Sequence, residues 1–184
     1  MLGRLLPLLI CGVIGFSSSV RAASDMQTLA ASLNDADFSS QVERLVRNQR
    51  SAQALELADI GLKRNPKNVQ LMFMRANLLQ QLGRGEEARS ALQRMIRDYP
   101  EIPEPYNNLA VIEAGLGNLE TAESLLTKAL VINADFGLAR KNLADVYLSL
   151  ALENYRRAEK ALPGNKAVAR RIETLERLSG ERAQ

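Results

Sequence analysis

Apolar residues recur every three or four positions along most of this chain, the spacing that places them on one side of a helix. The segment 69–82 shows the pattern, with Leu71, Met74, Leu78 and Leu82 on one stripe. Polar residues fill the other side, and glycine or proline interrupts the pattern at intervals. The pattern predicts an all-α chain of short helices, each buried on one side. The predicted helices cover residues 37–48, 51–63, 69–82, 86–97, 103–114 and 119–132.

The same residue types return with a period of 34 residues. One ladder of small residues consists of Ala54, Ala88 and Ala122, and a second consists of Ala76, Ala110 and Ala144. Further pairs and triplets keep this spacing: Pro66 and Pro100, Gly83 and Gly117, and Gly61, Met95 and Ala129. Alanine lets two helix backbones approach, glycine accepts a tight turn, and proline stops a helix. Several ladders in one register indicate repeated helix hairpins.

These ladders resemble the tetratricopeptide repeat (TPR) family. The resemblance implies antiparallel helix pairs that stack into a right-handed solenoid with a concave, partner-binding face. The units are 35–68, 69–102 and 103–136. The first unit departs from the motif, because Gln41 and Val42 replace its usual large and small pair. The third has Ala134 at the proline position, so we expect Asn133 and Asp135 to stop the helix, with Asp135 capping the next one.

The repeat changes after Ala144. The next alanine that could take the crossing position is Ala151, seven residues on where earlier units have twelve. The five missing residues are those of the turn between the two helices, and residues 138–162 contain no glycine or proline. The sequence therefore predicts a shortened unit, 137–164, formed by one continuous helix of about 25 residues and about 37 Å.

The second half of this long helix needs a cover for its apolar residues. In the segment 165–184, Asn165 can cap a helix in which Val168, Ile172 and Leu175 form one stripe. We therefore predict a C-terminal capping helix and tail. The alternative is that the exposed half of the long helix binds a partner or a second copy.

The first 22 residues have the pattern of a cleavable secretory signal: Arg4, an apolar run over 5–16, and Val20 and Ala22 before the cleavage point. The run is shorter than the about 20 residues that a membrane span needs. We expect export to the periplasm, or secretion, after cleavage near Ala22. Residues 23–34 would then be a loose leader or one more short helix. Cys11 raises the alternative of lipidation, although Ile10 before it is not the small residue that such a site prefers.

Charge and composition exclude several kinds of function. Cleavage would remove two arginines and no acid, so the net charge would fall from +3 to +1. A near-neutral chain gives no electrostatic reason to expect nucleic acid as a ligand. The chain has no histidine, and its one cysteine lies in the signal segment. Serine–histidine and cysteine–histidine catalysis and zinc sites on these ligands are therefore excluded. We expect no catalytic residue, metal or cofactor, and hence no enzyme.

The resemblance also suggests which side chains line the concave face, because the first helix of each TPR pair supplies them. The candidate partner-binding residues are Phe73, Asn77, Gln80, Asn107, Asn108, Val111, Lys141, Asn142 and Asp145. Asparagine is a poor residue inside a helix, so its repeated use needs a reason. It can hydrogen-bond an extended peptide, or it can join neighbouring repeats. Lys141 and Asn142 resemble part of a carboxylate clamp whose other basic residues are absent. Under the first alternative, alanine at Asn107 and Asn108 weakens partner capture and leaves melting unchanged.

Taken together, the residues and the resemblance predict a non-catalytic adaptor of the bacterial cell envelope that holds a protein or peptide partner. The stretch from Asn142 to Tyr147, which runs into Tyr155-Arg-Arg-Ala, resembles the fused final unit of exported Gram-negative envelope TPR proteins. The resemblance implies this location and suggests a link to enzymes that cross-link the cell wall. One alternative is a scaffold that self-associates through the surface from Tyr147 to Tyr155. A less favoured alternative is a lipoprotein assembly factor at a membrane.

Overall fold

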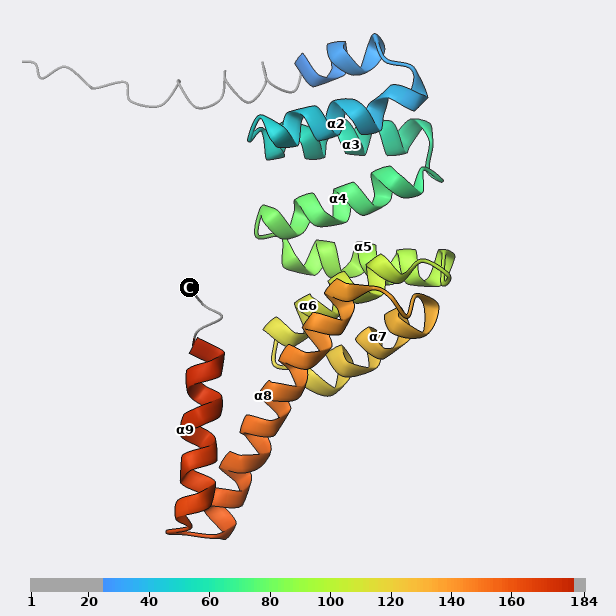
Figure 1. The fold of residues 1–184 in the computed structure, drawn as a ribbon. Helices are drawn as coiled ribbons and strands as arrows, with labels where there is room; N and C mark the ends of the chain where they lie inside the picture. The colour runs from blue at the N-terminus through green and yellow to red at the C-terminus, as the bar shows by residue number, and fades with distance from the viewer. Residues whose placement is uncertain (1–24, 181–184) are drawn as a thin grey trace, which may run out of the picture. The chain divides into compact units, whose positions relative to one another are not determined.

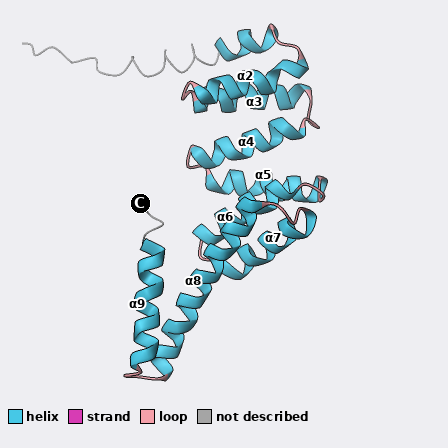
Figure 2. Ribbon diagram, viewed as in Figure 1, coloured by secondary structure: helices cyan, strands magenta, loops and turns pink. Residues whose placement is uncertain are grey.

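The structure, a computed structural model, describes residues 25–180. Within this range the chain is helical and contains no strand (Figures 1 and 2). The chain divides into two compact units, one ending at Arg84 and one beginning at Gly85. The first contains a helix over residues 25–31, η1 (Asp35–Asp37), α2 (Phe38–Arg47), α3 (Ser51–Arg64) and α4 (Val69–Gln81). The second contains α5 (Gly85–Asp98), α6 (Pro103–Gly115), α7 (Leu119–Ile132), α8 (Gly137–Ala161) and α9 (Lys166–Gly180).

The all-α prediction is confirmed, and each of the six short helices agrees with its predicted range to within one residue at either end. The leader over residues 23–34 is not loose throughout. Residues 25–31 form a helix, and Met26 and Ala30 on it are buried. The predicted signal segment, 1–22, lies outside the described residues.

The first unit is built around one close approach between helices. Gly61 on α3 is buried where Phe38 of α2 and Leu71 of α4 pack against it. An ion pair joins α3 to α4, with the Nε of Arg75 at 2.5 Å from the Oδ1 of Asp59. Buried apolar contacts thus set the helix packing, and the polar contacts lie at the edge of the core.

The second unit has a core of small residues around one aromatic ring. Its buried cluster comprises Tyr106, Ala110, Ala122, Leu126, Ala129, Ala139 and Val146. Ala110 and Ala122 belong to the two ladders found in the sequence, and both are almost fully buried. Small side chains at these positions let α6 and α7 pack closely, and α8 then packs against α7 and against α6.

The three turns inside the helix pairs have the same geometry. The N–H groups of Arg50, Arg84 and Asn118 donate to carbonyls five residues earlier, and each turn has one residue with a positive φ. That residue is glycine in two turns, Gly83 (φ 74°) and Gly117 (φ 83°). In the first turn it is Gln49 (φ 58°). The backbone of the first pair therefore keeps the repeat geometry even though its sequence lacks the glycine.

Replacing Gln49 by glycine is expected to stabilise the protein. A side chain in the left-handed region costs about 1–2 kcal/mol, which the substitution removes, and the more flexible unfolded chain offsets about half of that gain. We expect the free energy of unfolding to rise by about 0.5–1 kcal/mol, measured by urea denaturation. The Arg50→Gly variant, one residue outside the positive-φ position, serves as the control and is expected not to stabilise. A loss of stability in the Gln49→Gly variant would contradict this account of the turn.

Asparagine side chains mark two of the helix ends, and one predicted cap is absent. The side chain of Asn68 caps α4 by accepting from the N–H of Leu71 at 3.0 Å. Asn133 ends α7 as expected, and its Oδ1 accepts from the N–H of Asp135 at 3.1 Å. The prediction that Asp135 caps the next helix is wrong. The cap position of α8 is Phe136, which makes no side-chain cap, because the helix begins at Gly137, one residue later than a cap at Asp135 requires.

The long fused helix and its cover are confirmed. Helix α8 has 25 residues, and the turn after it repeats the backbone hydrogen bond that ends α7. The N–H of Leu162 donates to the carbonyl of Ala158, as that of Asn133 does to Ala129. Helix α9 packs against α8 (Figure 1), and the Oδ1 of Asn165 caps it by accepting from the N–H of Val168 at 3.2 Å.

Candidate functional site

A cavity with a volume of about 230 Å³ lies between α6, α7 and α8 in the second unit. Its wall is mostly apolar, and its polar atoms come from α8. The lining residues are Ala110, Val111, Ala114, Leu119, Leu126, Asn142, Asp145, Val146 and Ser149. The alanines on α6 leave the space that larger side chains would fill. Three of the candidate partner-binding residues, Val111, Asn142 and Asp145, are brought together here, and we call this cavity the α6–α8 groove.

The asparagines of α6 and α8 form one hydrogen-bonded chain. The Nδ2 of Asn142 donates to the Oδ1 of Asn107 at 2.9 Å, and the Nδ2 of Asn107 donates to the Oδ1 of Asn108 at 3.0 Å. Asn107 is buried, whereas Asn108 and Asn142 are half-buried. Of the two explanations for these asparagines, Asn107 and Asn142 fit the bond between neighbouring repeats. Asn142 also faces the groove, so this bond fixes the orientation of a groove side chain.

The position of Asn107 changes the expected effect of its replacement. Alanine would remove the acceptor of Asn142 and the donor to Asn108, so we expect a loss of about 1–2 kcal/mol in the free energy of unfolding. The expectation that melting stays unchanged therefore does not apply to Asn107. A double-mutant cycle with Asn142→Ala, followed by urea unfolding, measures the interaction directly. The double variant is expected to lose less than the sum of the single variants, and strict additivity would show that the bond contributes nothing.

The charged residues of the groove rim are paired with each other. The Nζ of Lys141 lies 3.0 Å from the Oδ2 of Asp145, one helical turn along α8. Lys141 is exposed and Asp145 is half-buried. An exposed pair of this kind contributes little to stability. A charged group on a partner could therefore replace either member of this ion pair at little cost.

The sequence model of the tetratricopeptide repeat matches residues 40–101 and 73–137, which together cover more than half of the 184 residues. The chain belongs to the tetratricopeptide repeat family. The matched residues include α6 and α7, and hence most of the apolar wall of the groove. A search of curated proteins finds no match.

Several solved TPR structures share this fold at low sequence identity. A TPR protein from Parabacteroides merdae has a TM-score of 0.62 and 20% identity, over 91% of this chain and 71% of that one. The first TPR of Spaghetti (RPAP3), bound to the HSP90 peptide SRMEEVD, has a TM-score of 0.59 and 17% identity, over 64% and 93%. YrrB, described as a TPR protein with an unusual peptide-binding site, has a TM-score of 0.56 and 22% identity, over 68% of each chain. These likenesses support the TPR fold.

The remaining candidate residues are spread over both units. Phe73, Asn77 and Gln80 share one stripe of α4 in the first unit, where Phe73 and Asn77 are half-buried and Gln80 is exposed. In the second unit, Asn108 and Lys141 do not line the cavity. Lys141 pairs with Asp145, which lines it, and Asn108 accepts from Asn107, which holds Asn142. Ser149, which adds a hydroxyl to the groove, was not predicted. Its signal in the sequence was present, because Ser149 follows Asn142 and Asp145 at helical spacing along the same face of α8.

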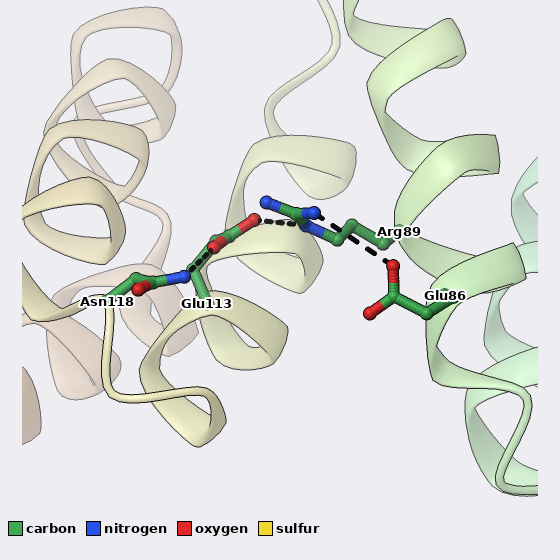
Figure 3. Close-up of polar contacts among 4 residues, drawn as sticks. All are labelled: Glu86, Arg89, Glu113 and Asn118. Atoms are coloured by element: carbon green, nitrogen blue, oxygen red, sulfur yellow. Dashed lines mark hydrogen bonds and ion pairs between the residues drawn. The ribbon is translucent and has the colours of Figure 1, made fainter.

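A buried carboxylate on α6, outside the groove lining, was also missed. Glu113 on α6 is only 2% exposed, and its Oε1 accepts from the Nε of Arg89 on α5 at 2.6 Å. Its Oε2 accepts from the Nδ2 of Asn118 at 2.7 Å, and Arg89 also lies 4.0 Å from Glu86 (Figure 3). The hydrogen bond from Arg89 lowers the pKa of Glu113, and burial opposes this shift only in part. The same bond raises the pKa of Arg89. The cluster is therefore an ionised clamp between α5, α6 and the turn before α7.

Other kinds of site find no support in the part of the chain that the structure describes. No group of three or more histidine, cysteine, aspartate or glutamate side chains is placed there to hold a metal ion. None of the helices in residues 25–180 has the length and apolar character of a membrane span.

Proposed function

We propose that this TPR protein is a non-catalytic adaptor that holds a short extended segment of a partner protein in the α6–α8 groove. The observation that carries the proposal is the cavity itself, with its apolar wall and the polar side chains of Asn142, Asp145 and Ser149 along one side. Apolar walls favour an apolar side chain, and amide and hydroxyl groups can bind the backbone beside it. A volume of about 230 Å³ is below the about 300–1,000 Å³ of typical small-molecule sites, so it suits one or two side chains of a peptide.

Two structural neighbours agree with this proposal. One TPR domain was solved with an HSP90 peptide bound, and another is described as having a peptide-binding site. Both are below 25% identity to this chain, so their ligands do not identify its partner. A non-catalytic role agrees with the absence of histidine from the sequence and with the general use of repeat folds as binding surfaces.

The proposed place of action is the bacterial cell envelope. The signal-like segment ending at Ala22 supports export and cleavage, and the resemblance to exported envelope TPR proteins supports a partner among cell-wall enzymes or assembly factors. The groove is the part of the chain that would contact this partner. The signal segment would determine only where the contact takes place.

A pair of valine variants tests the groove. Val111 lines the groove and is 42% exposed, whereas Val131 on α7 does not line it and is 82% exposed. A displayed library of linear peptides is selected on the wild-type protein, and the affinities of the enriched peptides are measured for both variants. Val111→Glu, which buries a charge against the bound side chain, is expected to weaken binding tenfold or more. Val131→Glu is expected to bind as the wild type does.

The result that contradicts the proposal is an equal affinity of the wild type and the Val111→Glu variant for every enriched peptide. A failure to enrich any peptide would contradict it as well. Both substitutions are at solvent-exposed positions, so we expect the helices to stay intact. Circular dichroism of both variants checks this.

A further inference from the structure

The end of the described chain forms a helix hairpin with few buried side chains. We define the C-terminal hairpin as residues 151–180, the second half of α8 and all of α9 (Figure 1). None of the side chains at 151–161 is buried, and the two buried residues of α9, Val168 and Ile172, are each 9% exposed. Leu162 is 51% exposed and Leu178 is 38% exposed. Helices of this length depend on tertiary packing for stability, and here each covers the other on one side only. The hairpin therefore has apolar surface available for a further contact.

The charges of the second unit are divided between its two ends. The C-terminal hairpin has seven basic and four acidic residues, whereas residues 85–132, which contain α5, α6 and α7, have four basic and eight acidic residues. Most of these acids are exposed. Asp98, Glu101 and Glu104 lie where α5 ends and α6 begins, and Glu86 and Glu120 lie at the opposite end of these helices, at the starts of α5 and α7. One end of the unit is thus net positive and the other net negative, so two copies of it are complementary in charge.

We infer that the C-terminal hairpin docks on the acidic surface at the α5–α6 turn, formed by Asp98, Glu101 and Glu104, of a second copy of this chain. A two-fold axis makes the contact twice, so each hairpin lies on the other copy and the assembly closes as a dimer. The exposed leucines of the hairpin become buried, and opposite charges surround them.

A nucleic acid and an anionic membrane fit the charges of the unit less well than a second copy does. A nucleic acid or an anionic membrane would attract the basic hairpin, but the acidic surface of the same unit would be repelled. The hairpin itself has four acids among its seven bases, which weakens its attraction for a uniformly negative surface. A second copy uses both ends of the charge pattern.

Dimerisation is separate from the proposed peptide binding, because no residue of 151–180 lines the α6–α8 groove. Sedimentation equilibrium of the purified protein at low and high salt measures the dissociation constant of the dimer. We expect a dimer at low salt whose dissociation constant rises with ionic strength, since salt screens exposed charges. A chain that stays monomeric at every concentration would overturn the inference, whether or not it binds vesicles that contain anionic lipid.

Charge reversal locates the contact. Arg170 and Arg171 are exposed on α9, and Arg170→Glu with Arg171→Glu is expected to weaken the dimer about tenfold or more. Acids in the first half of a helix suit its dipole, so α9 should remain folded. Lys63→Glu with Lys67→Glu changes the net charge equally in the first unit and is expected to leave the dimer unchanged. Equal effects of the two double variants would overturn the assignment to the hairpin.

A mixing experiment provides an independent check on the geometry. The variant with Glu101→Lys and Glu104→Lys reverses charge on the acidic surface, so it should also dimerise poorly alone. When it is mixed with the Arg170→Glu and Arg171→Glu variant, both reciprocal contacts again join opposite charges, and a mixed dimer is expected. If each variant is monomeric alone and the mixture also stays monomeric, the reciprocal docking is wrong.

Discussion

Replacing Glu113 by alanine is expected to lower the free energy of unfolding by about 2–3 kcal/mol, the largest loss from any polar residue of the second unit. The substitution removes two charge-assisted hydrogen bonds and leaves Asn118 and Arg89 without their buried acceptor. The loss is limited because Arg89 is about one-third exposed and can reach water. Urea unfolding followed by circular dichroism measures it. A loss below about 0.5 kcal/mol, the usual effect of a surface substitution, would contradict the clamp.

The repeat offers a matched control for this prediction. Glu113 occupies the position that Leu45 and Leu79 hold in the two preceding units, and all three are buried. Glu113→Leu therefore restores the apolar residue of the motif and should cost clearly less than Glu113→Ala. Both variants leave Arg89 and Asn118 without the carboxylate, so the difference between them measures the apolar packing that leucine restores.

Acid should act on the same clamp. The pKa of Glu113 is lowered from its ordinary value of 4.5, mainly by the bond from Arg89, so folding favours the ionised carboxyl. Its contribution is fully present above about pH 4.5 and is lost as the pH falls through the lowered pKa. Relative to the wild type, the Glu113→Leu variant should therefore lose less stability on acidification below that pH.

Replacing Gly61 by alanine is expected to destabilise the first unit by about 1–3 kcal/mol, although alanine is normally the better helix residue. A Cβ at this position would lie 2.7 Å from the Cδ1 of Phe38 and 2.8 Å from the Cδ1 of Leu71. Both side chains are almost fully buried, so the ring of Phe38 has no free space to move into. Thermal and urea unfolding measure the change.

Gly115→Ala is the control for this substitution. Gly115 is the last residue of α6, and nothing lies within 4 Å of an added Cβ there. The control is expected to keep or gain stability, because alanine favours the helix. If Gly61→Ala were as stable as Gly115→Ala, the close approach of α2, α3 and α4 at Gly61 would be wrong.

The helices were predictable because their positions depend on local signals. Apolar spacing marked each buried face, and the 34-residue ladders marked the crossing and turn positions. The missing five residues after Ala144 predicted α8, because a helix without its turn residues has no reason to stop. Even the first pair, which lacks a turn glycine, keeps the same turn at Gln49, where the N–H of Arg50 donates to the carbonyl of Leu45.

Contacts between distant side chains were not predictable in the same way. Glu113 was not identified from the sequence, because the Arg89 and Asn118 side chains that pair with it come from other elements. The asparagines were identified from their unusual positions, but the sequence left two explanations open. Only the 2.9 Å hydrogen bond shows that Asn107 and Asn142 join neighbouring repeats. The groove residues predicted from the family motif stay a prediction until a ligand is bound.

The measurement that tests the central claim most directly is photo-crosslinking in the living host. A photoreactive amino acid is placed at Val111 in the α6–α8 groove and, in a second strain, at Val131 outside it. The account predicts a crosslinked partner protein from position 111 and none from position 131. The same products from both positions, or products from position 131 alone, would contradict the claim that the groove binds the partner.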